Sequence, residues 1–378
     1  MNAVVPWIDE RRSEAAERFR ALGLPHRRIE EWKYTDLKTA LDGANDSDAG
    51  TVAWTIAKLP PGIQLFDLSD LTNAPGWVQR HFGKAATGAM SAVSLATARR
   101  GFAVRVPTNL AVTELLEVAF SGAGHFRALL VLEEGAALTL RESRKADAGF
   151  SNIGIEVVLG ANAHFTHIRI ADAAPKAIQV EDVAIRVSRD ASYRAHLVSC
   201  GASLSRLNLR LTLKEEGANA QVSGVSVLGD NLHADVTTEI YHGAGRTQST
   251  QLFKHVVGGR ARAVYQGKIT VAQHADKSDS RQTAKALLLG ERAEADLKPE
   301  LEIFTDDVKC AHGAAVGDLD ADSLFYLRAR GIPEAEARSM LIRAFLEEAV
   351  AEIADDAIRA STWHAIEDAL PRAMESTR

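Results

Sequence analysis

The chain has 378 residues, and its 44 Lys and Arg side chains are outnumbered by 50 Asp and Glu side chains, which gives a formal net charge of −6. No long block of Lys and Arg occurs, so the charge pattern lacks the basic footprint of a nucleic-acid-binding protein. No run of about eighteen apolar residues occurs either, which removes the usual support for a membrane-spanning helix.

The first ten residues lack the basic stretch followed by an apolar run that marks a secretory signal. The two cysteines, Cys200 and Cys310, are too few for the disulfide framework of a secreted protein, so free thiols are expected. These two features together predict a cytoplasmic protein.

Residues 1–100 are expected to form an N-terminal helical region. Charged residues alternate with apolar residues at helical spacing from Pro6 to Leu22, and a glycine and a proline soon afterwards end this helix. Residues 28–37 are expected to form a second short helix and a turn. Its aromatic residues, Trp32 and Tyr34, are expected to pack on a neighbouring core.

Residues 101–318 consist of short β-branched runs with alternating polarity, separated by turns that contain Gly-Ala or Asp-Ala. Most of these turns recur after roughly 25 to 31 residues, which is a repeat signature. A unit of this length cannot bury its own apolar face, so the copies must stack into a β-helix core. A β-sandwich with similar turns is the competing interpretation.

Residues 319–378 are expected to form a C-terminal helical domain. Asp320 is a suitable N-cap for its first helix, Gly331 occupies the C′ position, and Pro333 begins the next helix. The apolar stripes of these helices indicate either a core or a docking face for a partner. Deletion of residues 333–378 is expected to leave the β-helix folded.

The sequence contains no phosphate-binding Gly-x-x-x-x-Gly-Lys-Ser/Thr loop, no Gly-x-Gly-x-x-Gly and no His-Glu-x-x-His. The chain is therefore not expected to hydrolyse ATP, and we classify it as a non-enzyme. Two acidic pairs, Asp306 with Asp307 and Asp276 with Asp279, keep one alternative open. A β-helix that acts on carbohydrate as a lyase or hydrolase uses clustered carboxylates for acid–base chemistry.

The segment Cys310-Ala311-His312 contains the candidate metal ligands. Side chains at positions i and i+2 of a strand leave the same face, so the thiol and the imidazole are expected to point in one direction. Both bind thiophilic metals such as zinc or iron, but a closed tetrahedral site needs about four ligands. The missing ligands would come from another chain. The alternative is a buried cysteine beside a hydrogen-bonded histidine with no metal.

The segments 298–303, 306–314 and 324–332 resemble the SufB/SufD family of iron–sulfur cluster assembly scaffold proteins, and more closely its SufD branch. Residues 31–37 are similar to the aromatic segment near the start of the same family. The resemblance implies a mainly β fold, a right-handed parallel β-helix flanked by N-terminal and C-terminal helical regions. It also implies a scaffold subunit of the Suf complex (SufBCD), with a SufB-type paralogue paired through the β-helix and a SufC-type ABC ATPase docked on the C-terminal helices.

The same resemblance implies that Cys310 and His312 are interface ligands for a nascent Fe–S cluster. Of the two, we expect His312 to be the more important residue, because a neutral imidazole binds iron without adding negative charge. No cofactor is expected to be bound stably by the chain alone; a transient cluster would form at the heteromeric interface. The cysteines characteristic of the B branch have no counterpart around residues 293–295, and Gly313 replaces an acidic residue of that branch. Isolated subunits could pair as homodimers. No nucleic acid or membrane partner is expected.

Overall fold

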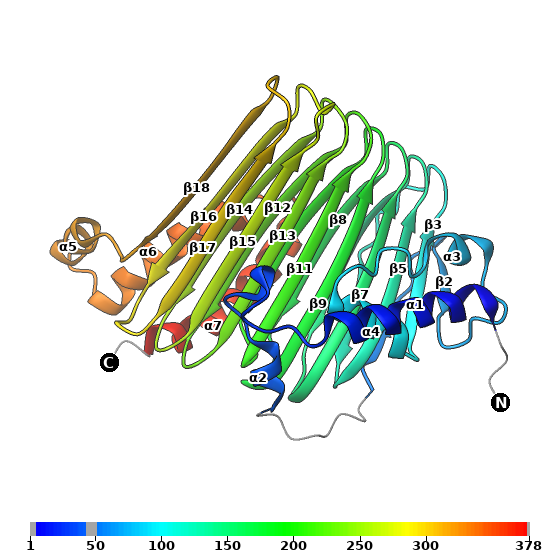
Figure 1. The fold of residues 1–378 in the computed structure, drawn as a ribbon. Helices are drawn as coiled ribbons and strands as arrows, with labels where there is room; N and C mark the ends of the chain where they lie inside the picture. The colour runs from blue at the N-terminus through cyan, green and yellow to red at the C-terminus, as the bar shows by residue number, and fades with distance from the viewer. Residues whose placement is uncertain (1–4, 43–50, 376–378) are drawn as a thin grey trace.

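A computed structural model describes residues 5–42 and 51–375, and Figure 1 shows a long solenoid of strands with helices at both ends. Residues 1–4, 43–50 and 376–378 lie outside these ranges. They are parts of the expected 1–100 and 319–378 regions, and residues 1–4 also begin the stretch that lacks the pattern of a secretory signal. The helices are α1 (Pro6–Leu22), a short 3₁₀ helix (Glu30–Trp32), α2 (Leu37–Asp42), α3 (Gly76–His81), α4 (Ala89–Thr97), α5 (Ala321–Ala329), α6 (Glu334–Val350) and α7 (Asp356–Glu375).

Eighteen strands in the described residues form two nine-stranded sheets. The first sheet contains β1 (Ala53–Ile56), β4 (Leu116–Ser121), β6 (Ala137–Arg144), β8 (His164–Ala171), β10 (Ser192–Ser199), β12 (Asn219–Leu228), β14 (Gln248–Val257), β16 (Asp279–Leu288) and β18 (Lys309–Gly317), in that order. The second contains β2 (Gln64–Asp67), β3 (Gly101–Val106), β5 (Gly124–Leu132), β7 (Ala148–Leu159), β9 (Lys176–Val187), β11 (Leu204–Leu213), β13 (His233–His242), β15 (Arg262–Val271) and β17 (Glu294–Ile303).

The chain alternates between the two sheets, so each coil adds one strand to each sheet. Apart from the short strands β1 and β2, which pair antiparallel with β4 and β3, the neighbouring strands within each sheet are parallel. This topology confirms the predicted mainly β fold with a parallel β-solenoid and flanking helices. An antiparallel sandwich is excluded.

The repeat seen in the sequence equals one coil. The in-register residues His164, Ser192, Asn219, Gln248, Asp279 and Lys309 follow one another at intervals of 27 to 31 residues. The recurring turns before these strands place a residue in the left-handed region, such as Gly135, Asn162 or Gly217. A Cβ atom on Gly217 would lie 2.1 Å from Asp190 Oδ1 in the preceding coil, so the close stacking of turns requires glycine there.

The space between the sheets is the main core, and we call it the lumen. Alternate residues of each strand point into it, and most are Val, Ile, Leu, Phe or Ala with almost no exposure. Polar side chains also enter the lumen. Arg169 forms two hydrogen bonds with the Glu181 carboxylate across it, at 2.6 and 2.7 Å, and both side chains are fully buried.

Each sheet is covered on its outer face by helices from one end of the chain. Helix α4 packs on β5, β7 and β9 and α1 packs on α4, whereas α6 and α7 pack on β12 and β14 of the other sheet (Figure 1). Ile342 and Ile366 from these C-terminal helices are fully buried against strand residues such as Val225. Deletion of residues 333–378 would expose this apolar face, so the packing opposes the expectation that the β-helix stays folded without them.

The segment 29–36 crosses the outer face of the second sheet and is held there by Arg206. This guanidinium lies over the Trp32 ring, 3.8 Å from its centroid, and donates a hydrogen bond to the Glu31 carbonyl at 2.5 Å. It also forms an ion pair with Asp235, to which Thr35 donates a second hydrogen bond. The predicted packing of Trp32 is confirmed, because its ring is buried against Ile178, Val180 and Leu204.

The Arg206–Asp235 pair generates a first prediction. Both side chains are 0 % exposed, so Asp235→Ala would leave a buried guanidinium without its counter-ion. We expect the free energy of unfolding to fall by about 3–5 kcal/mol. The measurement is urea denaturation followed by circular dichroism. Glu216→Ala is the control, because its ion pair with Arg246 is exposed and is worth less than about 1 kcal/mol; equal effects of the two variants would contradict the prediction.

Candidate functional site

The two candidate ligands lie on β18, the last strand of the first sheet. One edge of β18 pairs in parallel with β16, and Cys310 is opposite Ser280 while His312 is opposite Gln282. No other strand of residues 5–42 and 51–375 pairs with the outer edge of β18 or of β17. Figure 1 shows both strands at the C-terminal end of the solenoid. The site therefore belongs to an open coil whose backbone can accept another strand.

The register shows which way the two side chains point. Ser280 and Gln282 are almost completely buried in the lumen, so their in-register neighbours Cys310 and His312 share the lumen-facing side of β18. Cys310 is partly buried against the lumen core, whereas His312 is exposed because no further coil covers it. The predicted common direction of the two ligands is thus consistent with the strand register.

The thiol of Cys310 is in a surrounding that favours its protonated form. Partial burial, together with the negative charge of Asp279, raises its pKa above the usual value, and a hydrogen bond with the Ser280 backbone only partly offsets this. Below it, Ser280 Oγ is 2.7 Å from Ser249 Oγ, which is 2.9 Å from His242 Nε2. Burial lowers the pKa of His242 to about 4, so this polar row is uncharged at neutral pH.

The open coil also exposes apolar side chains. Ile303 is 40 %, Phe304 61 % and Val316 47 % exposed, whereas Val271, the in-register neighbour of Ile303 in the preceding coil, is buried. In addition, Leu297 and Leu301 of β17 pack only partly against the lumen core. An exposed apolar surface next to unpaired strand edges is typical of a face that another protein covers.

The chain does not supply a complete metal site in its described residues: no group of three or more His, Cys, Asp or Glu residues there could hold a metal ion. Cys310 and His312 are two ligands of a site that needs about four. Both cysteines are free, and Cys200 is buried far from solvent, where burial raises its pKa to about 12. The geometry fits an incomplete metal site, with two of about four ligands, on the edge strand β18.

The acidic residues considered for carbohydrate chemistry lie on turns. Asp306 and Asp307 are exposed between β17 and β18, and the exposed Asp276 accepts a hydrogen bond from Thr305 at 2.5 Å. Asp279 is half-buried at the start of β16 and lies 3.6 Å from Arg281. These contacts describe acidic turns at the surface.

The C-terminal helices differ in exposure. The side chain of Asp320 accepts a hydrogen bond from the Ser323 backbone at 2.7 Å, and Gly331 adopts φ +87°, so the predicted N-cap and C′ positions are confirmed. No residue of α5 is buried; Phe325 is 74 % and Tyr326 57 % exposed. Figure 1 shows α5 projecting beyond the end of the solenoid.

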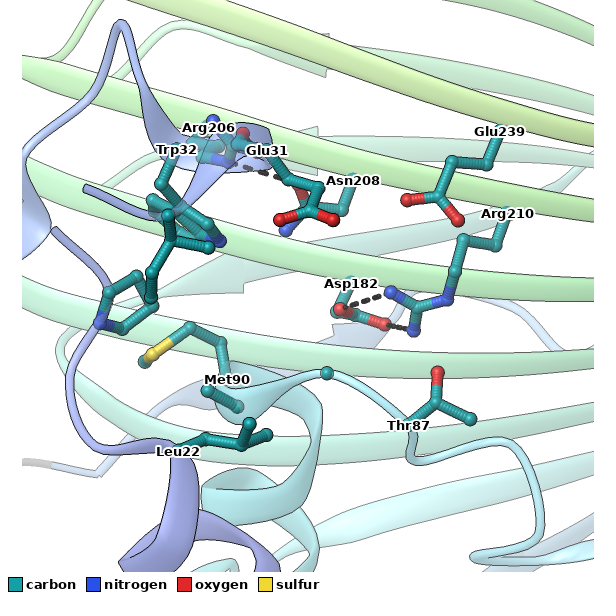
Figure 2. A pocket seen from close by; sticks show the side chains of 14 residues that line it. Leu22, Glu31, Trp32, Thr87, Met90, Asp182, Arg206, Asn208, Arg210 and Glu239 are labelled. Carbon is teal, nitrogen blue, oxygen red and sulfur yellow. Dashed lines mark hydrogen bonds and ion pairs between the residues drawn. The ribbon is translucent and has the colours of Figure 1, made fainter. Parts of the chain in front are cut away.

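A second surface feature is a cleft of about 270 Å³ beneath the segment 29–36 (Figure 2). Trp32, Met90 and Leu22 form one wall, and Asp182, Arg210 and Glu239 lie opposite. Figure 2 shows the Asp182 carboxylate paired with Arg210. Burial, partly offset by Arg210, raises the pKa of Glu239. Both arginines of this cleft therefore form ion pairs with carboxylates, Arg206 with Asp235 and Arg210 with Asp182. The cleft lies where the N-terminal segment packs against the second sheet.

Sequence reasoning missed Ser280 and Gln282, the residues that lie directly beneath the candidate ligands. The signal was present in the repeat. One coil near this end is 30 residues long, so subtraction of 30 from 310 and 312 gives 280 and 282. The same subtraction would have paired Arg206 with Asp235, which are in register on β11 and β13 and 29 positions apart. The contact of Arg206 with Trp32 had no such signal, because these residues are not related by the repeat.

Together, these features define a class of protein: a parallel β-solenoid with one open end that presents a cysteine and a histidine, and with an exposed helix beside it. A family model for the SUF system FeS cluster assembly SufBD core domain matches residues 118–345, more than half of the chain, and a SufBD N-terminal region model matches residues 2–52. The chain therefore belongs to the SufBD family.

Individual relatives agree with this membership. The iron–sulfur cluster assembly protein SufD of Escherichia coli K12 is 31 % identical, over 92 % of this chain and 90 % of the relative. A SufBD family protein of Synechocystis is 30 % identical, over 91 % and 87 % of the two chains. A SufBD family protein of Mycobacterium tuberculosis H37Rv is 29 % identical, over 93 % and 90 %. No helix in the described residues is long and apolar enough to cross a membrane.

The thiol environments generate a second prediction. Because the pKa of Cys310 is raised, the rate of its alkylation by iodoacetamide should rise roughly tenfold per pH unit between pH 7 and 9. Cys200 should stay unmodified in the folded protein, since it is buried and its pKa is about 12. Peptide mass spectrometry measures both. Cys310→Ser should be modified only after unfolding; a Cys310 rate that levels off below pH 9 would contradict the prediction.

Proposed function

We propose that this chain is a D-type, non-ATPase scaffold subunit of cytoplasmic iron–sulfur cluster assembly. In this proposal it pairs with a SufB-type paralogue and docks a SufC-type ABC ATPase. The observation that carries the proposal is the position of Cys310 and His312 on the lumen-facing side of β18, whose outer edge pairs with no other strand in the described residues. Family membership and the similarity to SufD of Escherichia coli support it.

Pairing is supported by the state of the last coil. The outer edges of β17 and β18 offer backbone donors and acceptors over ten and nine residues. The exposed Ile303, Phe304 and Val316 lie at the same end and supply apolar area for an interface. A paralogue with a similar open coil would satisfy both requirements. The same surface allows isolated copies to pair as homodimers.

The nascent cluster is the cargo of the proposed interface. This chain supplies two ligands, a thiol and an imidazole, and the partner supplies the others. A neutral imidazole binds iron without adding negative charge, so His312 is the ligand least opposed by its surroundings. Cys310 keeps its proton in the isolated chain, because its pKa is raised, and iron would displace that proton on binding.

ATPase docking is proposed for α5 and the exposed face of α6. Phe325 and Tyr326 on α5 and Met340 on α6 are large exposed apolar residues, whereas α6 and α7 bury their other faces against the sheet. Aromatic residues of this kind are common anchors at protein interfaces. The sequence contains no phosphate-binding loop, so ATP hydrolysis would be contributed by the docked partner.

The role of His312 is tested by His312→Ala. The side chain is exposed, so the variant should fold, pair and retain the ATPase. It should fail to restore Fe–S enzyme activity in cells that lack the native gene. Copurified subunits and the activity of an Fe–S enzyme are measured in parallel, with His274→Ala, an exposed histidine on the turn between β15 and β16, as control.

Normal Fe–S enzyme activity with His312→Ala would remove this residue from the proposed mechanism. Loss of copurified subunits would show instead that its role is structural. Activity that is lost while the complex remains intact is the expected result, because it separates ligation from assembly.

ATPase docking is tested by Phe325→Glu. A charge in place of this exposed anchor should weaken the affinity for the ATPase subunit by about 2 kcal/mol or more, roughly thirtyfold. Pull-down and calorimetric titration measure it. Leu65→Glu is the matched control, since Leu65 is also exposed, at 40 %, but lies on β2 at the other end of the solenoid. Equal affinity of the two variants would show that α5 is not the docking element.

A further inference from the structure

A row of hydrogen-bonded polar side chains runs through the lumen toward the open coil. Thr238 on β13 donates to Gln251 Oε1 on β14 at 2.7 Å, and Tyr265 on β15 donates to the same oxygen at 3.1 Å. Gln282 Nε2 on β16 then donates to Tyr265 OH at 2.7 Å. All four side chains are buried, and the row crosses between the sheets strand by strand. The row ends at Gln282 on β16, and His312 lies beside Gln282 on the next strand of the same sheet, β18.

The direction of these hydrogen bonds fixes the amide of Gln282. Tyr265 has one hydroxyl proton and gives it to Gln251, so its oxygen accepts from the Gln282 amide nitrogen. The Gln282 carbonyl oxygen is thereby turned elsewhere, and it is buried without a hydrogen-bond partner. Gln251, the in-register residue of the preceding coil, does not donate a hydrogen bond to the Gln282 oxygen, because Gln251 Nε2 also has no hydrogen-bond partner. A buried acceptor left unpaired is costly, so a missing donor is expected nearby.

His312 is a polar neighbour of Gln282 on the outer side. The two residues are direct partners in the β16–β18 register, on the same face, with strands about 4.8 Å apart. On the opposite sheet the outer position belongs to Leu297, which has no donor in its side chain and is in register with Tyr265. The ring N–H of His312 is therefore the donor that the geometry offers.

The backbone is also adapted to this arrangement. A Cβ atom on Gly267 of β15 would lie 1.8 Å from Gln282 Nε2 and 2.4 Å from Tyr265 OH. Glycine at this position therefore leaves the space in which the Gln282 amide and the Tyr265 hydroxyl meet. This second observation, separate from the unpaired oxygen, shows that the backbone of β15 makes room for the Gln282 amide beside the Tyr265 hydroxyl.

We propose that Gln282 is a positioning residue that accepts a hydrogen bond from one ring nitrogen of His312 and so leaves the other nitrogen free to bind iron at the open end. An imidazole that donates one N–H to a fixed acceptor is held in a single tautomer and orientation. The proposal rests on the role of His312 in the proposed function. Its first test measures the tautomer directly and does not depend on cluster assembly.

The test uses the full-length chain labelled with ¹⁵N-histidine. The His312 ring signals are identified by their loss in His312→Ala, and their ¹⁵N shifts at pH 8 report the ratio of the two tautomers. In the wild type one tautomer should dominate. Gln282→Met, which has a similar volume and no acceptor, should lower the ratio roughly fivefold to tenfold. Gly267→Ala keeps the glutamine but displaces its amide and should shift the ratio in the same direction.

Gln179→Met is the matched control, because Gln179 is also a buried lumen glutamine with an unpaired carbonyl oxygen, on the distant strand β9. It should leave the His312 signals unchanged. A wild-type His312 with averaged shifts, or unchanged shifts in Gln282→Met, would overturn the proposal. The wild-type measurement decides even if a variant fails to fold.

The cellular assay separates this proposal from the proposed function. Gln282→Met should give Fe–S enzyme activity between those of the wild type and His312→Ala. If Gln282→Met changes the tautomer while His312→Ala assembles clusters normally, Gln282 positions His312 and the proposed ligand role fails. If His312→Ala abolishes assembly while Gln282→Met changes neither tautomer nor activity, the ligand role stands and the positioning role fails.

Discussion

A parallel solenoid satisfies its backbone hydrogen-bonding groups only between neighbouring coils, so its last coil always retains a row of unpaired groups. The two ends of this protein treat that constraint differently. At the N-terminal end the edges are the four-residue strands β1 and β2, which pair antiparallel and are too short to extend the sheets far. At the C-terminal end β17 and β18 are full-length and open. The candidate ligands lie at this open end.

The lumen combines an apolar core with polar residues placed coil by coil. Glu142, Arg144 and His167 lie together with Arg169 and Glu181, and these side chains are almost completely buried. A register slip of one residue would turn each charged group to the opposite face and leave its partner alone in the core. The ion pairs therefore oppose slipped registers. Near the open end neutral groups replace the ions, from His242 to Gln282.

The helices divide into those that complete the core and one that does not. The helices α6 and α7 cover an apolar strip on the first sheet, and α1 with α4 covers part of the second. In contrast, α5 buries none of its residues and carries its aromatic side chains outward. The proposed docking surface is thus independent of the solenoid core. The proposed pairing surface is part of the core itself, because the lumen side chains of the last coil reach solvent.

The sequence alone determined the repeat, the parallel solenoid and several helix boundaries, because left-handed turns, alternating strands and capping residues each depend on local chemistry. For example, the glycines and Asn162 in recurring turns mark positions where most side chains are strained, and Asp320 and Gly331 bound α5 through their own backbone preferences. Spacing also placed Cys310 and His312 on one face. Only the tertiary structure decided that β18 is the terminal strand, that Arg206 lies over Trp32, and that the Gln282 oxygen is left unpaired. These relations depend on which coil stacks on which and on which face each helix covers, and such contacts between distant residues leave no local pattern in the sequence.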